Sequence, residues 1–490
     1  MRPHPHLYEI NTWPWLDHLS RQADRPITLG TVPASEWDRL RALGIDIVYL
    51  MGIWKRSSLG RLLALSNLPL FELFDRTLPR WLPEDVAGSA YCIAGYEPDP
   101  QIGTWDDLAS ARAHLHARGM QLFVDFIPNH TGFDHPWIGL HPDRYIRTTV
   151  EGFRRAPEEF RAIATVSKDV HYVACGRDPY FPPWQDVAQL DYSSPDTRGA
   201  MVAELAQLAQ RVDGVRCDMA MLVLSDVFRA TWKDHLTAPV PDREFWSDAR
   251  RAVPSLSLMA EVYWDLEWRL QELGFDFTYD KRLYDRLLHA EPADVRGHLN
   301  GDDGYQRRSA RFIENHDEER SAPTFADRLK AAAVTVGTVQ GLRFFYDGQF
   351  EGRTDHLPVQ LGRWRDASPD RALSSFYDRL LAAIDAEVFH QGAWQMLDVH
   401  AAGDGSSENL AAWSWVHGTD VRVVVVNLGP TQSQGLVQLS HALQPDHSST
   451  LVFDDQLTGE RYPWTRQALH QGLYVRLERG AAHLFKVGPP

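Results

Sequence analysis

Short apolar runs alternate with longer amphipathic segments over the first three-quarters of the chain. This rhythm predicts βαβ units and therefore a parallel sheet. The runs predicted as strands are Leu7–Ile10, Ile45–Leu50, Leu122–Phe126, Gly214–Cys217, Leu258–Val262, Phe275–Tyr279, Phe312–Asn315 and Leu342–Tyr346. Strands of this number and character fit a closed barrel, whose interior is filled by large and β-branched side chains. We therefore predict an α/β fold built on a (β/α)8 TIM barrel.

The segments between these runs carry helix signals. Thr104 to Gly119 precedes the third strand and is predicted as a helix. It ends in Ala-Arg-Gly, and a glycine is a common stop signal at the end of a helix. Asp196 is predicted to cap a helix over Arg198–Val212, where apolar positions recur at helical spacing. Ser374 to Ala386 is predicted as the last barrel helix.

Two stretches interrupt or follow the barrel pattern. The segment after the third strand is too long for a simple loop and is rich in Pro, Tyr, Trp and Phe, which indicates a small inserted lid domain over residues 131–196. After about Phe389 the chain shows short alternating runs such as Leu473–Leu477, which are typical of antiparallel strands. We predict a barrel over residues 1–130 and 197–388 and a C-terminal β-sandwich domain over 389–490.

Composition limits the class of partner. The formal net charge is −16 and no block of Lys and Arg occurs, which argues against nucleic acid or an anionic membrane as a partner. Three scattered cysteines give neither a disulfide framework nor a metal motif. No apolar run has the length of a signal peptide core or a membrane span, so we expect a cytoplasmic protein. The 17 Trp residues could offer faces for sugar rings, although most are expected in the core.

Acidic and imidazole side chains follow four of the predicted strands. The four segments read Val124-Asp125-Phe126-Ile127-Pro128-Asn129-His130, Asp213-Gly214-Val215-Arg216-Cys217-Asp218, Met259-Ala260-Glu261-Val262 and Phe312-Ile313-Glu314-Asn315-His316-Asp317. Because the C-terminal ends of barrel strands meet at one mouth, these side chains should converge. Helix capping could explain a single acid at a strand end. It predicts neither Arg216 two residues before Asp218 nor His316 next to Asp317.

These residue types suit the cleavage of a glycosidic bond. That reaction passes through an oxocarbenium-like state flanked by two carboxyl groups, one an ionised nucleophile and the other a proton donor. Arg216 is expected to keep Asp218 ionised, whereas the apolar neighbours of Glu261 favour its protonated form. We expect the two pKa values to be pushed in opposite directions. Asp317 could grip sugar hydroxyls, with hydrogen bonds added by His130 and His316.

The four segments resemble the signature regions of the α-amylase family, glycoside hydrolase family 13. The patterns D-x-x-x-N-H, G-x-R-x-D, an isolated E after a strand and N-H-D occur in the family's order. This resemblance implies that Asp218 is the nucleophile, Glu261 the general acid/base and Asp317 the transition-state stabiliser. It also implies that Arg216, His130 and His316 surround the sugar at the cleaved bond, that Asp125 supports the cluster and that Tyr91 stacks on the sugar.

Departures from the family's patterns leave the substrate open. Met219-Ala220-Met221-Leu222 follows Asp218 in place of the Lys-His pair of many endo-acting α-amylases, and Gly88-Ser89-Ala90 lacks the Asp of many α-glucosidases. In many relatives Asn129 would help to hold calcium. No second ligand cluster is evident here, so we expect Asn129 to satisfy loop backbone, with no metal and no cofactor required.

Three functions are compatible with the sequence. The first is a retaining hydrolase of small α-glucosides or short α-glucans. The second is a transglucosylase or glucoside-isomerising enzyme, which would share the covalent intermediate on Asp218 and differ in what attacks it. The third, a non-catalytic sugar-binding protein, predicts a missing acid, although all three are present. The linkage cleaved, endo or exo action and the oligomeric state lie beyond the sequence.

Overall fold

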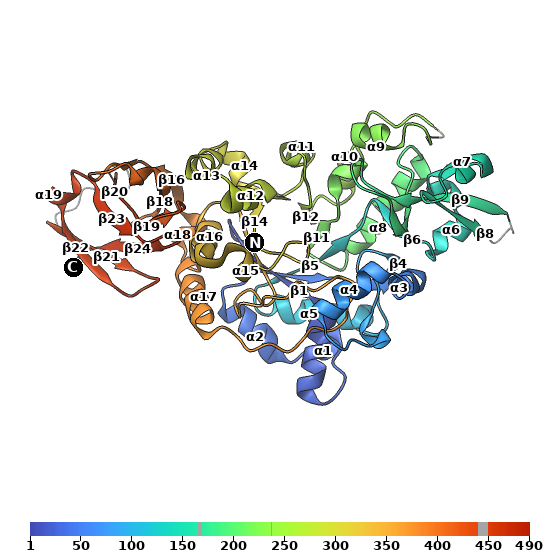
Figure 1. The fold of residues 1–490 in the computed structure, drawn as a ribbon, viewed down its shortest axis with the longest axis horizontal. Coiled ribbons are helices and arrows are strands. Elements are labelled where there is room, and N and C mark those ends of the chain that lie inside the picture. The colour runs from blue at the N-terminus through green and yellow to red at the C-terminus, as the bar shows by residue number, and fades with distance from the viewer. Residues whose placement is uncertain (165–168, 237, 440–448) are drawn as a thin grey trace.

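Parallel strands close into a barrel at the centre of the molecule (Figure 1). The computed structural model describes residues 1–164, 169–236, 238–439 and 449–490. In chain order, the barrel strands are β1 (His6–Asn11), β2 (Ile47–Met51), β5 (Gln121–Phe126), β11 (Gly214–Cys217), β12 (Ser257–Ala260), β13 (Phe277–Tyr279), β14 (Ser309–Arg311) and β15 (Leu342–Tyr346). Strands β1 and β15 pair and close the ring, so the predicted TIM barrel is confirmed.

One predicted strand is misplaced. The seventh strand was expected at Phe312–Asn315, but β14 spans Ser309–Arg311, and the predicted residues follow it. The reason is that β14 carries a buried arginine. Arg311 is 1% exposed and its Nε lies 3.2 Å from Oδ2 of buried Asp280, so an ion pair replaces the apolar side chain that a core strand was expected to show.

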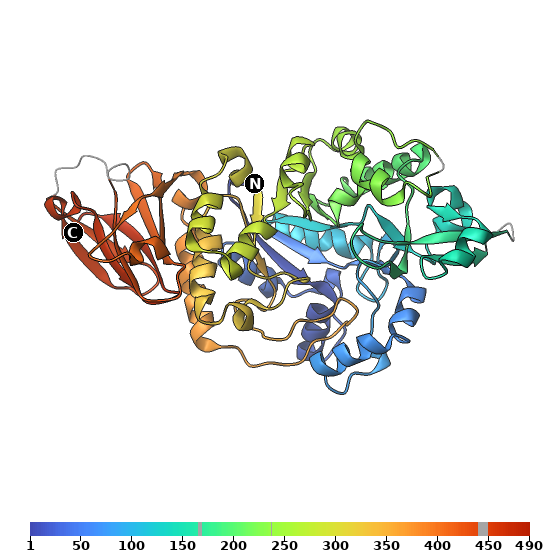
Figure 2. The ribbon, with the colours of Figure 1, turned by 45° about the horizontal axis from the view of Figure 1, so that its top comes forward.

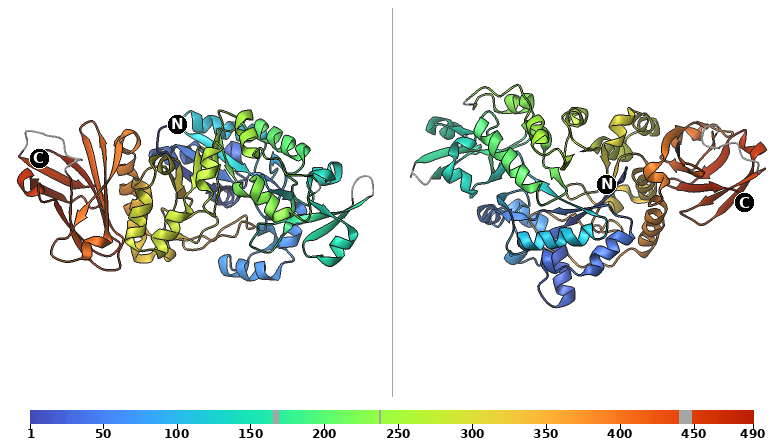
Figure 3. Two further views of the ribbon diagram at one scale, coloured as in Figure 1. Left: turned by 90° about the horizontal axis from the view of Figure 1, so that it is seen from above. Right: turned by 180° about the vertical axis from the view of Figure 1, so that it is seen from behind.

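Helices follow the strands and cover the outside of the barrel (Figure 3). The main ones are α2 (Ala34–Ala42), α5 (Trp105–His116), α8 (Pro195–Leu208), α10 (Phe245–Ala252), α11 (Glu267–Glu272), α12 (Lys281–His289), α13 (Pro292–Leu299), α16 (Leu329–Thr338) and α17 (Arg371–Ile384). Helix α5 begins at a capping box in which Thr104 and Asp107 satisfy each other's backbone N–H groups. Helix α8 begins earlier than predicted, because Ser194 and not Asp196 accepts its N-terminal hydrogen bond.

The segment after β5 forms its own antiparallel sheet at one end of the molecule (Figure 2). Its strands are β6 (His130–Gly132), β7 (Arg147–Thr148), β8 (Phe160–Ala164), β9 (Val170–Gly176) and β10 (Trp184–Gln189). Strand β6 begins four residues after β5 ends, so this sheet starts directly at the barrel mouth. The residue at which one domain ends and the next begins stays a prediction.

A pair of antiparallel sheets forms the opposite end of the molecule (Figure 1). One sheet contains β16 (Ala393–Leu397), β18 (Leu410–His417), β19 (Asp420–Asn427), β24 (Ala482–Gly488), β21 (Thr450–Asp455) and β22 (Arg461–Thr465). The other contains β17 (Val399–His400), β20 (Ser433–Val437) and β23 (Leu473–Leu477). A separate apolar core fills the space between the sheets, while the other face of the larger sheet packs on the barrel helices. The predicted C-terminal β-sandwich is confirmed.

No helix in the described part of the chain combines the length and the apolar character needed to cross a membrane.

Candidate active site

Strand register places two of the predicted acids next to each other. Cys217 of β11 pairs with Ala260 of β12, and the residues that follow are Asp218 and Glu261. Side chains alternate along a strand, so Arg216 and Asp218 point to the same side of β11. Both strands end at the same mouth, and the sequence therefore brings the two carboxyl groups and one arginine together.

Arg216 is the centre of this cluster. Its guanidinium is buried, with Nη1 2.8 Å from Oδ1 of Asp218 and Nη2 2.8 Å from Oε2 of Glu261. The same Nη2 lies 3.6 Å from Oδ2 of Asp317, and Nη1 lies 3.9 Å from Oδ1 of Asp125. One fixed, planar cation thus sets the positions of all three proposed catalytic acids.

The two oxygens of Asp218 have different surroundings. Oδ1 accepts a hydrogen bond from Arg216. Oδ2 is buried and has no hydrogen-bond partner among the described residues. A buried carboxylate oxygen is costly to leave unpaired, and such an exception in a native site calls for an explanation. The free lone pairs of Oδ2 are those that a nucleophile needs.

Glu261 is held from two sides. Oε2 accepts a 2.7 Å hydrogen bond from the backbone N–H of Met219, in addition to the contact with Arg216. Oε1 accepts a 2.9 Å hydrogen bond from the hydroxyl of Tyr263. The expectation that Glu261 lies in apolar company is therefore wrong, since three polar groups contact its carboxyl group.

The expected pKa pattern is also wrong in part. Burial raises the pKa of Asp218 to about 6, although the charge of Arg216 acts in the opposite direction. Burial raises the pKa of Glu261 to about 7, again against Arg216, with the neighbouring Asp218 charge adding to the rise. Both values move upward instead of in opposite directions. Their order is the expected one, with Glu261 the weaker acid.

A chain of hydrogen bonds fixes Asp317. Nε2 of His316 lies 3.1 Å from Oδ2 of Asp317 and 2.5 Å from the Tyr91 hydroxyl, while Nδ1 lies 2.5 Å from Oε1 of Glu9. Burial alone would lower the pKa of His316, but the charges of Asp317 and Glu9 raise it well above its usual value. Burial would raise the pKa of Asp317, but His316 and Arg216 hold it below its usual range. Asp317 is thus kept ionised beside an imidazolium.

These residues border one open cavity of about 350 Å³. Five of the eight predicted site residues line it: Tyr91, His130, Asp218, Glu261 and Asp317. Asp317 is the most accessible of the three acids, with 41% of its side chain exposed. The volume falls within the usual range of small-molecule sites.

The other three predicted residues lie behind this wall. Arg216 and His316 are buried and contact the acids. Asp125 is fully buried, and its carboxylate accepts hydrogen bonds from the Tyr49 hydroxyl at 2.5 Å and the Gly52 backbone N–H at 2.7 Å. Asp125 is placed to support Arg216 and the turn after β2 and does not border the cavity.

Sequence reasoning missed several residues at the site. Trp184 and Asp186 line the cavity from β10, and Gln360 lines it from the loop after β15. Trp184 meets His130 edge to face with ring centres 5.5 Å apart, a contact between two strands of the inserted sheet. Glu9, which contacts His316, was missed as well, although a charged residue inside the apolar first strand is a signal that could have been noticed. No comparable pattern marks the residues in the loop or in the inserted sheet.

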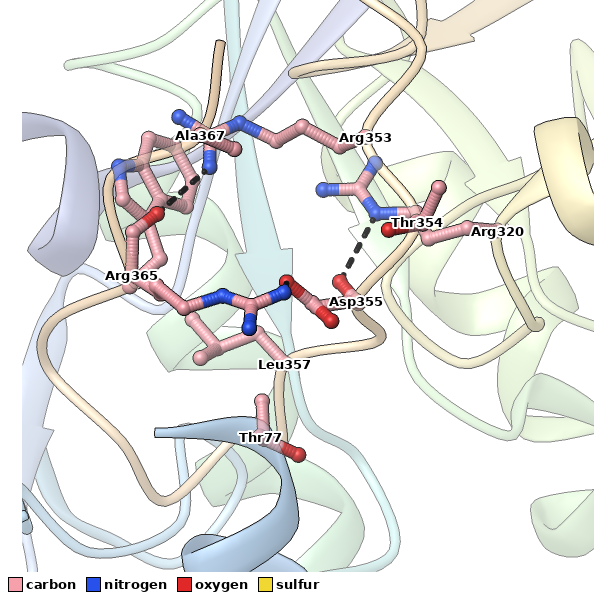
Figure 4. A pocket seen from close by; sticks show the side chains of 9 residues that line it. Thr77, Arg320, Arg353, Thr354, Asp355, Leu357, Arg365 and Ala367 are labelled. Atoms are coloured by element: carbon pink, nitrogen blue, oxygen red, sulfur yellow. Dashed lines mark hydrogen bonds and ion pairs between the residues drawn. The ribbon is translucent and has the colours of Figure 1, made fainter. Parts of the chain in front are cut away.

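Arginines anchor the loop that carries Gln360. Figure 4 shows Arg320, Arg353 and Arg365 around a hollow of about 10 Å³, room for about one water molecule. Arg353 donates to the carbonyl oxygen of Arg365 at 3.2 Å, and Arg365 pairs with Asp355.

The anchored loop reaches the site at two points. Nε2 of His356 lies 2.8 Å from the carbonyl oxygen of His316. The carbonyl oxygen of Gln360 accepts from the backbone N–H of Ala87 at 2.8 Å, close to Tyr91. The arginine-rich hollow is therefore structural, and the loop around it supports the cavity wall.

Two places in the described part of the chain hold side chains that could bind a metal ion, Asn129 near the acids and a cluster at the other end of the barrel. Oδ1 of Asn129 accepts from Nε2 of Gln189 at 3.0 Å, so the amide is paired within the protein. Within the described ranges, one group of potential ligands comes together, namely His6, Asp385 and His390. His6 lies at the start of β1, away from the mouth, and its Nε2 is 3.0 Å from Nη1 of Arg343. An adjacent guanidinium disfavours a cation there.

Comparison with known proteins agrees with this geometry. The family model for the α-amylase catalytic domain matches residues 34–394. The α-amylase MalA of Haloarcula japonica is 26% identical over 358 residues, 71% of this chain and 49% of that protein. Palatinase of Erwinia rhapontici is 22% identical over 375 residues, 67% of this chain and 65% of that protein. The chain spans about half the length of MalA and of α-amylase 3 of Dictyoglomus thermophilum.

Solved structures share the fold over nearly the whole chain. The maltogenic α-amylase AmyB of Thermotoga neapolitana superposes with a TM-score of 0.70 at 20% identity, covering 99% of this chain and 98% of that one. A trehalulose synthase, MutB, superposes with a TM-score of 0.64 at 16% identity, covering 99% of each chain. The barrel, the ordered signature segments and the convergent acids are those of an α-amylase-type catalytic domain. The chain belongs to the α-amylase family.

Proposed function

We propose that this protein is a retaining enzyme that cleaves the α-glucosidic bonds of small α-glucosides or short α-glucans. The single observation that carries this proposal is the bridging of Asp218 and Glu261 by Arg216 at the wall of one cavity. Two carboxyl groups on either side of a scissile bond are what a double displacement requires. Asp218 is the nucleophile, Glu261 the acid/base and Asp317 the group that grips the sugar in the transition state.

In the first step, Glu261 gives its proton to the glycosidic oxygen. The bond between that oxygen and the anomeric carbon breaks, and its electron pair stays with the oxygen, which leaves as a hydroxyl group. Oδ2 of Asp218 supplies the electron pair for a new bond to the anomeric carbon, forming a glycosyl ester. Oδ1 stays bound to Arg216, which fixes the direction of the attacking oxygen.

In the second step, ionised Glu261 takes a proton from water as the water oxygen attacks the anomeric carbon and Asp218 leaves. The two inversions restore the α configuration. The same ester would serve a transglucosylase or a glucoside-isomerising enzyme, in which a sugar hydroxyl attacks in place of water. A protein that only binds sugar is disfavoured by the free Oδ2 of Asp218, which binding would not need.

Product analysis tests the proposal. The protein is incubated separately with maltose, isomaltose, sucrose, trehalose and soluble starch, and the products are separated by chromatography. Release of glucose or short glucans supports hydrolysis, whereas new oligosaccharides or isomeric disaccharides support transfer. Asp218→Asn should lose at least about a thousandfold in turnover while it still binds the substrate. Undiminished turnover in Asp218→Asn would refute the proposal.

A further inference from the structure

The two oxygens of Glu261 are not equivalent. Oε2 faces the backbone N–H of Met219 at 2.7 Å and Nη2 of Arg216 at 2.8 Å. A peptide N–H and a guanidinium can only donate hydrogen bonds. A proton on Oε2 would point at donors, so Oε2 is restricted to accepting. Oε1 faces one polar group among the described residues, the hydroxyl of Tyr263 at 2.9 Å.

A tyrosine hydroxyl is the kind of partner that suits a titrating oxygen. It can donate to an ionised carboxylate and, after rotation of its hydrogen, accept from a protonated one. We propose that the transferable proton of Glu261 resides on Oε1 and that Tyr263 is the positioning residue that holds this oxygen. The inference deepens the proposed function and rests on it.

Tyr263 reaches Glu261 from outside the substrate cavity. Its ring lines a neighbouring hollow of about 400 Å³ with Trp264, Phe181 and Met219, and it is absent from the lining of the catalytic cavity, which Met219 shares. Tyr263 therefore acts through Glu261 and does not touch the reacting sugar in this arrangement.

The backbone around Glu261 is shaped to make these contacts. Met219 has φ +42°, and Trp264 and Asp265 have φ +64° and +65°. Left-handed conformations are uncommon in residues other than glycine, and they persist where the surrounding structure enforces them. The first is at the residue whose N–H donates to Oε2, and the other two turn the chain directly after Tyr263. All three positions therefore lie at or directly after Met219 and Tyr263, the residues that contact Glu261.

Other charges also face this carboxyl group. Arg216 lowers the pKa of Glu261, while Asp218 and Asp317 raise it. None of them contacts Oε1 within the described ranges, so the Tyr263 hydroxyl can be removed without disturbing the contact between Arg216 and Oε2.

The test compares two leaving groups in Tyr263→Phe. Fluoride departs from α-glucosyl fluoride without a proton, whereas the leaving sugar of a disaccharide needs one from Glu261. We expect the variant to lose about tenfold or more in kcat/KM on the disaccharide and to stay within about threefold in kcat/KM on the fluoride, because kcat/KM reports the first step, in which the leaving group departs. Loss of a donor to ionised Glu261 should also raise the pKa of Glu261. The alkaline limb of the kcat/KM profile on the disaccharide should then move upward by about half a pH unit to one pH unit.

Tyr192→Phe is the matched control. The Tyr192 hydroxyl is buried and donates to the carbonyl oxygen of Pro128 at 2.7 Å, with no contact to Glu261. This variant should treat both substrates alike and keep the wild-type pH limb. Equal loss on the two substrates in Tyr263→Phe, or an unchanged alkaline limb, overturns the inference.

Two further measurements separate the possible failures. Glu261→Gln should lose disaccharide cleavage and keep the initial burst of fluoride release from α-glucosyl fluoride, because on that substrate only the second step needs Glu261; if it cleaves the disaccharide normally, the proposed function itself fails. Neutron diffraction of the unmodified protein, with Glu261 protonated, locates the proton directly and does not depend on a variant that folds. A deuterium on Oε1 is expected, and a deuterium on Oε2 would overturn the inference.

Discussion

Asp218 and Glu261 share one guanidinium, yet their free oxygens face different surroundings. Asp218 keeps Oδ2 without a partner among the described residues, and Glu261 keeps Oε1 next to a hydroxyl that can reverse its role. Arg216 therefore ties down the oxygens that do not react and leaves the reacting ones available. A lysine, with a single point charge, could not span both carboxylates in this way.

The pH dependence of kcat/KM follows from this pair. Asp218 must be ionised, so activity should rise as the pH rises through about 6. Glu261 must be protonated, so activity should fall as the pH rises through about 7. We expect a narrow bell-shaped pH profile with its maximum between these values. Because the two carboxyl groups interact, the acid and alkaline limbs report the titration of the pair as a whole. Initial rates on a cleaved disaccharide measure it; a flat profile from pH 5 to 9 would contradict the assignment of these acids.

At the residue level, the sequence signal was clearest where polarity broke an apolar strand. Asp218 and Glu261 stood out because each directly follows a buried run, and barrel geometry then predicted their meeting. Asp186 and Gln360 carried no such signal, since their positions depend on how the inserted sheet and the long loop fold back over the mouth. The direction of the Asp218 pKa shift was missed because the sequence does not show how completely the group is buried.

At the scale of elements, two barrel strands follow turns in which a glycine has a left-handed backbone. Gly341 precedes β15 with φ +100°, and an added Cβ would lie 2.2 Å from the carbonyl oxygen of Ser309. Gly119 stands just before β5 with φ +73°, but an added Cβ there would meet nothing within 4 Å. The two glycines share a backbone constraint and differ in steric room.

This pair gives a stability prediction. Gly119→Ala should cost about 1–2 kcal/mol, because only the left-handed backbone is penalised. Gly341→Ala should cost at least about twice as much, since a backbone oxygen cannot move aside like a flexible side chain. Thermal unfolding of the two variants measures the difference. Equal melting temperatures would show that the close approach to Ser309 is not a real constraint.

Element boundaries were harder to predict than element types. The parallel order of the barrel followed from the alternation of apolar runs and helices, but β14 was placed three residues too late. Arg311 inside that strand is compatible with burial because Asp280 pairs with it and Gln306 accepts from it, and Asp280 lies on a different part of the chain. The start of α8 depended on whether Ser194 or Asp196 accepts the capping bond, and both residue types are good caps.

At the scale of the whole molecule, the C-terminal sheets are tied to the barrel. Trp415 of β18 is fully buried, and its indole N–H donates to the carbonyl oxygen of Thr338 in α16 at 2.6 Å. The apolar face of the larger sheet continues the barrel core at this point. We infer that barrel and C-terminal sheets stabilise each other.

Trp415→Ala tests this coupling. Loss of the buried ring should cost about 3–5 kcal/mol and lower the temperature at which activity is lost, although Trp415 is remote from the acids. Trp464→Ala is the control, because Trp464 packs only partly on the separate core between the C-terminal sheets. Calorimetry and a parallel activity assay measure the effect. If Trp415→Ala lowered the unfolding temperature of a separate transition and left the temperature of inactivation unchanged, the inference would be contradicted.

The central claim is that two carboxyl groups on one arginine carry out two successive displacements at a single sugar carbon. Proton NMR during the first turnovers on an α-linked substrate tests it most directly, because the anomeric proton of the first-formed sugar can be observed before mutarotation mixes the anomers. The account predicts a first product with the α configuration. A β product would show a single displacement by water and would contradict the assignment of Asp218 as the nucleophile.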